Sequence, residues 1–383
     1  MKKIWMFTLL GFMALSSFAQ TRTNKDGSNY QFTVEKEIET TPVENQNMTG
    51  TCWSFSTLSF IESELMRKGW PQLNLSEMFI VRQTYIDKAD KYVRMHGNLN
   101  FGQGGEFHDV IDMIGKYGVV PESVYPGLDY GTSKHIHGEL EAVLKGIVDA
   151  VIKNENKKLT PVWKDAFKAV LDVYLGPMPT EFRVDGKTYT PKSYADKLGI
   201  KPDDFVELTS FTHHPFYQPF VLEIPDNWDS KQVYNVPLDD MQRIIDNALE
   251  KGYGVAWGSD VSDEGFSWRN ALTIVPDKDW DDMSKAEKED VFTNPVQQKK
   301  ITQEMRQKAF DDWETTDDHG MHITGIAKDQ NGTKYYIVKN SWGDNSCGGF
   351  LYASESYVLI RTTCFMVHKD ALPKDIKKKL GID

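Results

Sequence analysis

The order in which helical and strand patterns follow one another is the feature that most constrains the fold of this chain. Apolar residues recur at three- and four-residue steps in a helix expected from Cys52, and helices are also indicated from Ser76 and through the charged region 139–175. Strand patterns come late, beginning near Met321 and continuing past an Asn331-Gly332 hairpin turn. Helices first and antiparallel strands last predict the α+β class.

Local signals mark the ends of the first two helices. Thr51 is placed to cap the helix from Cys52, and Gly69 and Pro71 end it. Ser76 begins the second helix, of which we expect three charged side chains to face water: Glu77, Lys88 and Lys91. Further helices and strands are expected at 106–117, 239–251, 321–327, 334–340 and 350–353.

Residues 1–19 predict a secretory signal peptide. Lys2 and Lys3 precede an apolar run from Ile4 to Leu15, and Ser17-Phe18-Ala19 is typical of a cleavage site. A buried N-terminal helix is the alternative interpretation. The mature chain is expected to begin at Gln20 and to work in an extracytoplasmic space, either periplasmic or secreted.

Composition excludes several classes of protein. With 56 acidic and 44 basic residues the net charge is −12, whereas a protein that binds nucleic acid without sequence preference needs a basic face. Three cysteines are too few for a disulfide scaffold or a four-thiolate zinc site. No apolar run is long enough to span a bilayer. We therefore expect no cofactor, no metal, no nucleic-acid partner and no membrane span.

One cysteine stands where its chemistry would be altered. Cys52 lies within the segment 46–55, Gln-Asn-Met-Thr-Gly-Thr-Cys-Trp-Ser-Phe, at the first turn of the expected helix. The positive end of a helix dipole favours thiolate over thiol, and thiolate is the nucleophilic form. The alternative is a buried structural cysteine, which is the commoner fate of an isolated one.

Two segments far along the chain supply partners for such a thiol. His319, before the first late strand, can carry a proton at neutral pH, and the amide of Asn340 can orient its ring. Trp342 can shield that hydrogen bond from water. The side-chain amide of Gln46 and the backbone N–H of Cys52 can donate to a developing oxyanion.

A second histidine, His322, competes with His319 for the role of base. The two point to opposite faces of a strand. A two- or four-residue loop centred on Asn331-Gly332 would place residue 323 opposite Asn340, and His319 shares the face of residue 323. This parity favours His319. A strict register leaves it several residues along from Asn340, so an asymmetric turn or a bulge is needed to join them.

The segment from Gln46 to Phe55, together with Asn340-Ser341-Trp342-Gly343 far downstream, resembles the papain-like cysteine peptidases. The similarity covers most of residues 40–370 and is closest to the bleomycin hydrolase/aminopeptidase C branch. Three segments carry the likeness to that branch: Gly-Gln-Gly-Gly at 102–105, Lys-Tyr-Gly-Val-Val-Pro at 116–121 and Leu-Gly-Pro-Met-Pro at 175–179.

The resemblance implies a two-lobed fold, with a helical lobe and an antiparallel β lobe, and a hydrolase that cleaves peptide bonds through a thioacyl-enzyme. It favours an aminopeptidase acting on small peptides. The site residues that it implies are Cys52 as nucleophile, His319 as base, Asn340 as orienting group, Gln46 in the oxyanion hole, and Gly104, Gly105 and Trp342 beside the substrate. An endopeptidase, an acyltransferase with the same triad and a non-catalytic peptide-binding protein remain as alternatives.

Spacing supports the choice of branch and sets the expected domain boundaries. Cys52 and His319 are 267 positions apart, whereas ordinary papain-like enzymes use roughly 130 to 150. The expected organisation is a signal peptide at 1–19, a leader arm at 20–40, and a peptidase domain at 41–383 with an insertion at about 130–315. Only 32 residues separate Gln20 from Cys52, so no bulky inhibitory pro-segment is expected.

The resemblance also implies a homo-oligomer, because the branch forms hexamers in which the chain's own C-terminus lies in the cleft. The tail here, residues 377–383, does not resemble that terminus.

The two remaining cysteines, Cys347 and Cys364, either pair with each other or are simply buried. His213-His214 and His135-x-His137 are interpreted as ordinary histidines rather than metal ligands.

Overall fold

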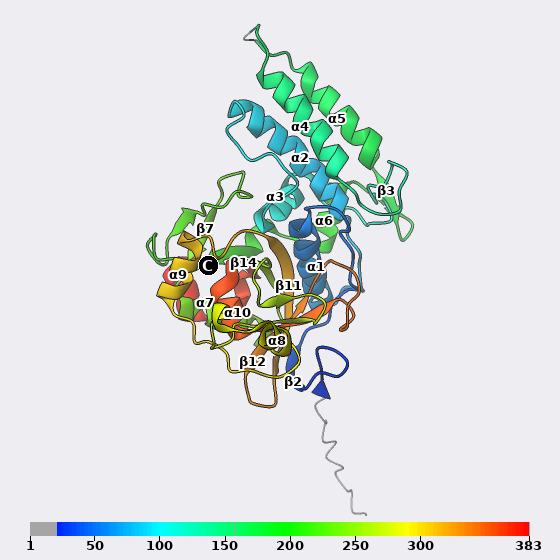
Figure 1. The fold of residues 1–383 in the computed structure, drawn as a ribbon. Helices are drawn as coiled ribbons and strands as arrows, with labels where there is room; N and C mark the ends of the chain where they lie inside the picture. The colour runs from blue at the N-terminus through cyan, green and yellow to red at the C-terminus, as the bar shows by residue number, and fades with distance from the viewer. Residues whose placement is uncertain (1–20, 157, 383) are drawn as a thin grey trace, which may run out of the picture.

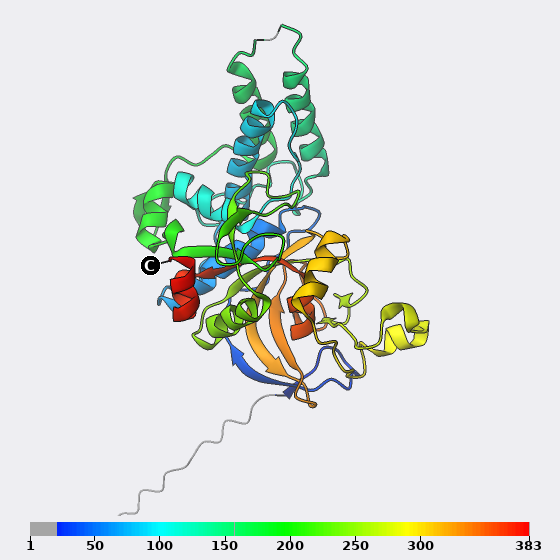
Figure 2. The same cartoon turned by 90° about the vertical axis from the view of Figure 1, so that its left-hand side faces the viewer.

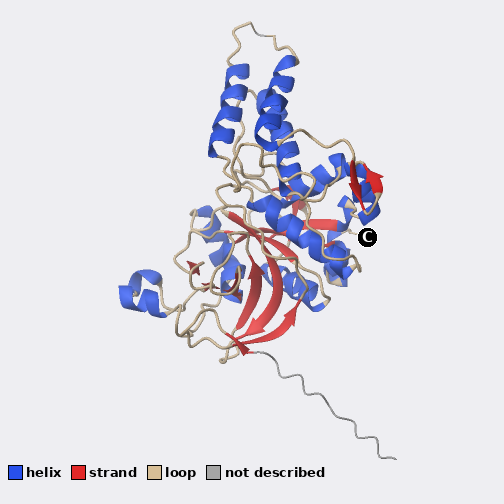
Figure 3. Cartoon of the chain, turned by 90° about the vertical axis from the view of Figure 1, so that its right-hand side faces the viewer, coloured by secondary structure: helices blue, strands red, loops and turns tan. Residues whose placement is uncertain are grey.

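The computed structural model describes residues 21–156 and 158–382; the expected signal peptide lies outside the described residues. Helices come first in the chain and most strands later (Figure 1), and Figure 3 shows the helices and strands in separate colours. The α-helices are α1 Cys52–Arg67, α2 Glu77–Arg94, α3 Phe107–Tyr117, α4 Gly138–Ile152, α5 Val162–Leu175, α6 Pro191–Leu198, α7 Leu238–Glu250, α8 Lys285–Asp290, α9 Gln303–Asp311, α10 Glu355–Arg361 and α11 Lys374–Leu380. Among the described residues, no helix combines the length and apolarity that crossing a membrane requires.

Strands form one long mixed sheet and a separate small hairpin. The main sheet runs in the order β6-β7-β5-β14-β8-β11-β12-β13-β10-β9, with β2 added beside β11 and β1 beside β2. The strands are β1 Thr21–Arg22, β2 Phe32–Glu37, β3 Phe182–Val184, β4 Lys187–Tyr189, β5 Phe205–Thr209, β6 Pro219–Val221, β7 Gln232–Asn235, β8 Val255–Ser259, β9 Phe266–Ser267, β10 Leu272–Thr273, β11 His319–Lys328, β12 Lys334–Lys339, β13 Phe350–Ser354 and β14 Thr362–His368.

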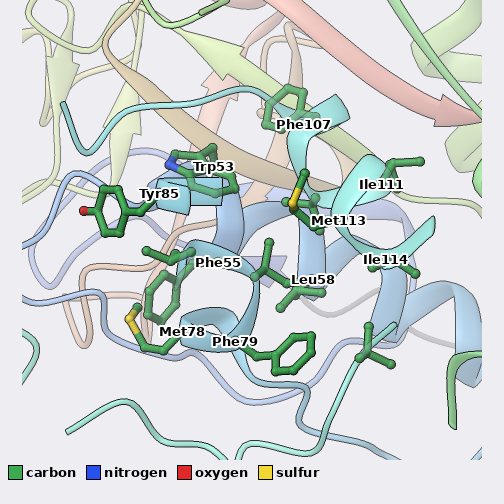
Figure 4. Packing of buried hydrophobic residues seen from close by; sticks show 14 of the residues in the cluster. Trp53, Phe55, Leu58, Met78, Phe79, Tyr85, Phe107, Ile111, Met113 and Ile114 are labelled. Carbon is green, nitrogen blue, oxygen red and sulfur yellow. The ribbon is translucent and has the colours of Figure 1, made fainter. Parts of the chain in front are cut away.

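The molecule has two lobes with separate cores. Helices α1 to α6 bury one apolar cluster against sheet residues such as Ala256 and Met366, and the strands with α7, α10 and α11 bury two others. Figure 4 shows how side chains of α1, α2 and α3 fill the first cluster, among them Trp53, Phe79 and Phe107. Helices α4 and α5 form a hairpin that projects away from the sheet (Figures 1 and 2).

The expected helix starts are confirmed, but one expected cap is wrong. Ser76 caps α2, since its hydroxyl accepts a hydrogen bond from the N–H of Phe79 at 3.0 Å. Thr51 makes no such bond, because its hydroxyl is paired with that of Thr49 at 2.6 Å. No side chain caps the first turn of α1, which begins at Cys52.

The expected solvated face of α2 is also wrong for two of its three residues. Glu77 and Lys88 are buried, and only Lys91 remains partly exposed. Lys88 is drawn inward because its amine donates to the carbonyl oxygens of Gly102 and Gly104, which belong to the loop before α3. A buried cation thus holds that loop against α2.

The segment 20–40, for which no strand is expected from its sequence, contributes to the main sheet. β2 pairs antiparallel with the far half of β11, with Gly325 opposite Glu37. The near half of β11 pairs instead with β8, His319 lying opposite Ser259. β11 is therefore paired along one edge by β8 and then β2, and from His322 onward along the other edge by β12, which supports the residue at its start.

Candidate active site

Cys52 is the first residue of α1 and is partly exposed. The start of β11 lies directly against this turn. A Cβ on Gly320 would come within 2.8 Å of the hydroxyl of Ser56 and 3.4 Å of the Cα of Trp53, so only glycine permits the approach. The backbone amide of Gly320 reaches the Cys52 thiol. His319 therefore lies beside the first turn of α1.

Burial disfavours the charged forms of Cys52 and His319 when each group is considered alone. It raises the pKa of the Cys52 thiol to about 12, in opposition to the hydrogen bond from Gly320. It lowers the pKa of His319 to about 4, although the bond to Asn340 acts in the other direction. The helix dipole alone therefore does not keep the thiol ionised. Thiolate and imidazolium formed together would stabilise each other, so transfer of one proton creates a pair instead of an isolated charge.

His319 and Asn340 are joined by a short hydrogen bond, 2.6 Å between Nε2 and Oδ1. The expectation that residue 323 lies opposite Asn340 is wrong, because His322 pairs with Lys339 and Ile323 with Val338. Two single-residue shifts produce this register: the hairpin loop has five residues, 329–333, and the ladder slips between Ile323 and Gly325. Together the two shifts move the register by two residues, so His319 stays on the same face of β11 and lies two residues closer to Asn340. An asymmetric turn or a bulge was expected to close this gap.

The amide oxygen of Asn340 determines which ring nitrogen of His319 carries the proton. Oδ1 also accepts the backbone N–H of Ser341 at 2.7 Å, so it acts as an acceptor in both bonds. Nε2 of His319 is then the protonated nitrogen. Nδ1 is left as the nitrogen that can accept a proton.

Trp342 covers this hydrogen bond. Its ring stacks on that of His319, with centroids 4.4 Å apart and an angle of 29° between the planes. The rings of Phe266 and Trp268 meet Trp342 edge-on and hold it in place. Of these, the sequence analysis identified only Trp342, since nothing in the local pattern around residues 266–268 shows that they approach residue 342.

Gln46 lies on the same side of the site and is tied to the residue after Asn340. Its Oε1 accepts the hydroxyl of Ser341 at 2.6 Å, and one hydrogen of its Nε2 is donated to the carbonyl of Thr49 at 2.7 Å. An amide nitrogen carries two hydrogens, so a second is available for a ligand. The backbone N–H of Cys52 belongs to a helix's first turn, where N–H groups have no partner within the helix.

Steric contacts explain why residues 104 and 105 of the loop 102–105 are both glycine. A Cβ on Gly105 would lie 2.7 Å from the carboxylate of Asp109 and 3.0 Å from the ring of Trp53. A Cβ on Gly104 would lie 1.8 Å from a carboxylate oxygen of Asp226. Trp53 also donates its ring N–H to the carbonyl of Gln103 at 3.0 Å, which fixes this loop beside Cys52.

His322 lies away from this arrangement. It is buried against α1, and its Nδ1 is 3.1 Å from the hydroxyl of Ser59. The alternative that Cys347 and Cys364 pair is wrong: all three cysteines are free thiols. Cys347 donates to the carbonyl of Asn24, and Cys364 to Glu106, so each lies in its own environment.

Two clusters of side chains within the described ranges have the spacing of a metal site. One is His213, His214 and Glu223; the other is Glu106, Glu207 and Cys364. Glu223 already accepts both imidazoles of the first cluster, at 3.1 and 2.8 Å.

Two carboxylates near the thiol escaped the sequence analysis: Asp226 and Asp317. Asp317 stands two residues before His319, so its nearness could have been inferred from the assignment of that base. Asp226 lies in the loop between β6 and β7, more than a hundred residues from Gly104, and no local signal connects the two.

A sequence model of the Peptidase C1-like family matches residues 13–160 and 179–383. The chain belongs to this family. Aminopeptidase G of Lactobacillus delbrueckii subsp. lactis is 26% identical over 389 residues, which cover 90% of this chain and 85% of the relative. Aminopeptidase C of the same organism is 27% identical over 393 residues, covering 90% and 83%. The expectation of a papain-like peptidase of the bleomycin hydrolase/aminopeptidase C branch is confirmed.

The fold of this family member is likewise confirmed as papain-like α+β. The crystal structure of PepW from Lactobacillus rhamnosis HN001 matches it with a TM-score of 0.68 at 20% identity, over 91% of this chain and 84% of that one. The family model and the aminopeptidase relatives show the class of activity, which the fold by itself does not. The chain is therefore a hydrolase of the cysteine peptidase class.

Proposed function

We propose that this cysteine peptidase is an aminopeptidase that removes N-terminal residues from small peptides, with Cys52 as nucleophile. The hydrogen bond between His319 and Asn340, at the point where β11 meets the first turn of α1, is the observation that carries the proposal. The names of the relatives, aminopeptidases C and G, support exopeptidase action.

The proposed reaction follows from the atoms available. Nδ1 of His319 takes the proton of the Cys52 thiol as sulfur attacks the peptide carbonyl carbon. The oxyanion that forms is stabilised by the backbone N–H of Cys52 and by the free Nε2 hydrogen of Gln46. The imidazolium returns its proton to the leaving amine, which departs and leaves a thioester. Water, deprotonated by the same ring, then releases the amino acid and restores the thiol.

Digestion of peptides followed by mass spectrometry tests this proposal. Unblocked peptides should lose residues one at a time from the N-terminus, and their N-acetylated counterparts should resist. Internal cuts in the blocked peptides would show an endopeptidase instead, and transfer of the acyl group to an added amine would show an acyltransferase. The Cys52→Ala variant should be folded and inactive; activity that survives this change would contradict the assignment of the nucleophile.

We also propose that the enzyme acts outside the cytoplasm. The signal-peptide pattern of residues 1–19 supports this location. Expression of the full chain in a bacterial host and mass spectrometry of the exported product should give a mature N-terminus at Gln20. An intact Met1 in an active, cytoplasmic product would contradict it.

A further inference from the structure

Removal of a single N-terminal residue imposes a requirement on the cleft. The substrate's α-ammonium lies only two bonds from the carbonyl carbon that Cys52 attacks, and it carries a positive charge and three hydrogens to donate. Burying it beside the thiol without acceptors would be costly. An enzyme that selects free N-termini therefore needs anionic acceptors within a few ångströms of Cys52, and the following inference rests on the proposed aminopeptidase function.

Asp226 presents one such acceptor beside the loop 102–105. The loop between β6 and β7 brings its carboxylate so close to Gly104 that a Cβ there would meet Oδ2 at 1.8 Å. The amide of Asn100 donates to Oδ1 at 3.0 Å and leaves Oδ2 on the side of Gly104. Asp226 is only partly exposed, as are Cys52 and Gly104 themselves.

Asp317, two residues before His319, presents a second acceptor. Its Oδ2 is buried and has no hydrogen-bond partner among the residues that the structure describes. The backbone N–H of Asp226 approaches the Asp317 carboxylate, which brings these two residues together, and the side chain of Glu106 shares a hydrogen bond with Asp317. A buried carboxylate oxygen without a donor, next to the nucleophile, indicates a place left for a cation.

Both carboxylates are within electrostatic reach of the thiol. Each contributes to raising the pKa of Cys52, after the larger effect of burial. Their own pKa values are raised too, chiefly by burial and partly by a neighbouring carboxylate, Asp226 for Asp317 and Glu141 for Asp226, whereas a hydrogen bond with Glu106 lowers the pKa of Asp317. A bound ammonium would remove this repulsion.

The one buried cation beside Asp226 within the described part of the chain, Lys88, does not fill this role. Its charge stabilises the Asp226 carboxylate, but its amine donates its hydrogen bonds to the carbonyl oxygens of Gly102 and Gly104. The loop that carries Asp226 is also anchored independently, since Trp228 donates its ring N–H to Asp109 at 2.8 Å. Asp226 is thus held in place by contacts that leave Oδ2 available.

We propose that Asp226 and Asp317 together bind the α-ammonium of the substrate, and so restrict this enzyme to peptides with a free N-terminus. The two carboxylates come from separate segments, the loop between β6 and β7 and the residues before β11, and they lie together near the Cys52 thiol. Two of the three ammonium hydrogens bond to Asp226 Oδ2 and Asp317 Oδ2. A substrate extended beyond its first residue would place a neutral amide against two carboxylates and lose this interaction.

The test compares an aminoacyl coumarin amide with its des-amino analogue, which lacks only the ammonium. Asp226→Asn and Asp317→Asn should each lower kcat/KM for the aminoacyl substrate by about 10- to 100-fold, the value of a charge-assisted hydrogen bond. Turnover of the des-amino substrate should change little. Asp229→Asn is the matched control, because it removes the same charge from the same loop but its carboxylate faces Lys91 at 3.0 Å.

Alkylation of Cys52 by iodoacetamide separates this role from a structural one. Since both carboxylates disfavour the thiolate, each variant should react at least as fast as the wild type while its aminopeptidase activity falls. Slower alkylation together with equal losses on both substrates would show a merely structural role. A preference for the aminoacyl substrate that persists in both variants would overturn the ammonium site alone. Wild-type enzyme without that preference would overturn the aminopeptidase function and this inference with it.

Discussion

A single oxygen atom, Oδ1 of Asn340, organises the histidine of the site. It accepts from Nε2 of His319 and from the backbone N–H of Ser341, so its orientation does not depend on the histidine alone. Stacking of Trp342 on the imidazole keeps water from competing for the bond. His319 therefore carries its proton on Nε2 and leaves Nδ1 free, which is the state that the proposed general base requires.

The two histidines of β11 are expected to respond differently to replacement. His319→Ala should lower kcat/KM by about 10²- to 10⁴-fold, the usual contribution of a general base, with little loss of stability. His322→Ala removes a buried ring that packs against Phe60 and contacts Ser59, so it should lower the free energy of unfolding and affect turnover far less. Steady-state kinetics and urea unfolding distinguish the two effects. An inactive His322→Ala enzyme beside an active His319→Ala enzyme would reverse the assignment.

Two elements, α1 and β11, define the site by how closely they approach. The approach depends on Gly320, whose missing side chain leaves room for Ser56 and Trp53. It also depends on the slip in the β11–β12 ladder near Thr324, without which Asn340 would lie farther along the strand from His319. Bulges beside active sites commonly redirect a side chain in this way.

Gly320→Ala tests the importance of this approach. The added Cβ would lie 2.8 Å from the hydroxyl of Ser56, so β11 must move away from Cys52. We expect kcat to fall at least about tenfold, and the free energy of unfolding to fall by about 1–3 kcal/mol, as in other overpacked cores. Kinetics and denaturant titration measure both quantities.

The control for this prediction is the double variant Gly320→Ala with Ser56→Ala, which removes the hydroxyl that the new methyl group meets. It should recover part of the activity and stability, while Ser56→Ala alone should leave kcat close to that of the wild type. Full activity of Gly320→Ala would show that the close approach of the two elements is not required.

At the scale of the whole molecule, the lobes are joined by buried polar groups behind the site. Lys339 of β12 donates to the hydroxyls of Thr41 and Ser59, at 3.0 and 2.9 Å. Thr41 in turn donates to the carboxylate of Glu62 on α1 at 2.7 Å. Burial raises the pKa of Glu62 to about 7 and lowers that of Lys339. The seam between the lobes is therefore sensitive to pH.

Glu62→Gln should change how stability depends on pH. The folded pKa of about 7 lies above the value near 4.3 of an unfolded chain. The contribution of this carboxyl is thus fully present below about pH 4.3 and is lost as the pH rises through about 7. Between pH 4.5 and 8 the wild type should lose up to about 3 kcal/mol of unfolding free energy relative to the variant. Urea titrations at both pH values measure this, and equal pH dependence in the two proteins would contradict it.

The sequence by itself determined the class, the helix that presents Cys52 and the hairpin that carries His319, while the resemblance to the family pointed to the glycine pair at 104–105. The helix and the hairpin depend on residues that are close together in the chain. The periodicity of apolar residues and the turn residues therefore indicate which side of each element is buried. Even the strand face on which His319 lies could be deduced, because side chains along a strand alternate between the two faces of the sheet.

Only the tertiary structure decided the rest. The bulge near Thr324, the burial of Lys88 and the arrival of Asp226 at Gly104 depend on contacts between segments far apart in the chain. Local patterns do not record such contacts, because a loop's path is set by the surfaces on which it packs and by its distant hydrogen-bond partners. For that reason the residues proposed to react were recognisable from sequence, while the carboxylates proposed to bind the substrate's amine became visible only in the folded chain.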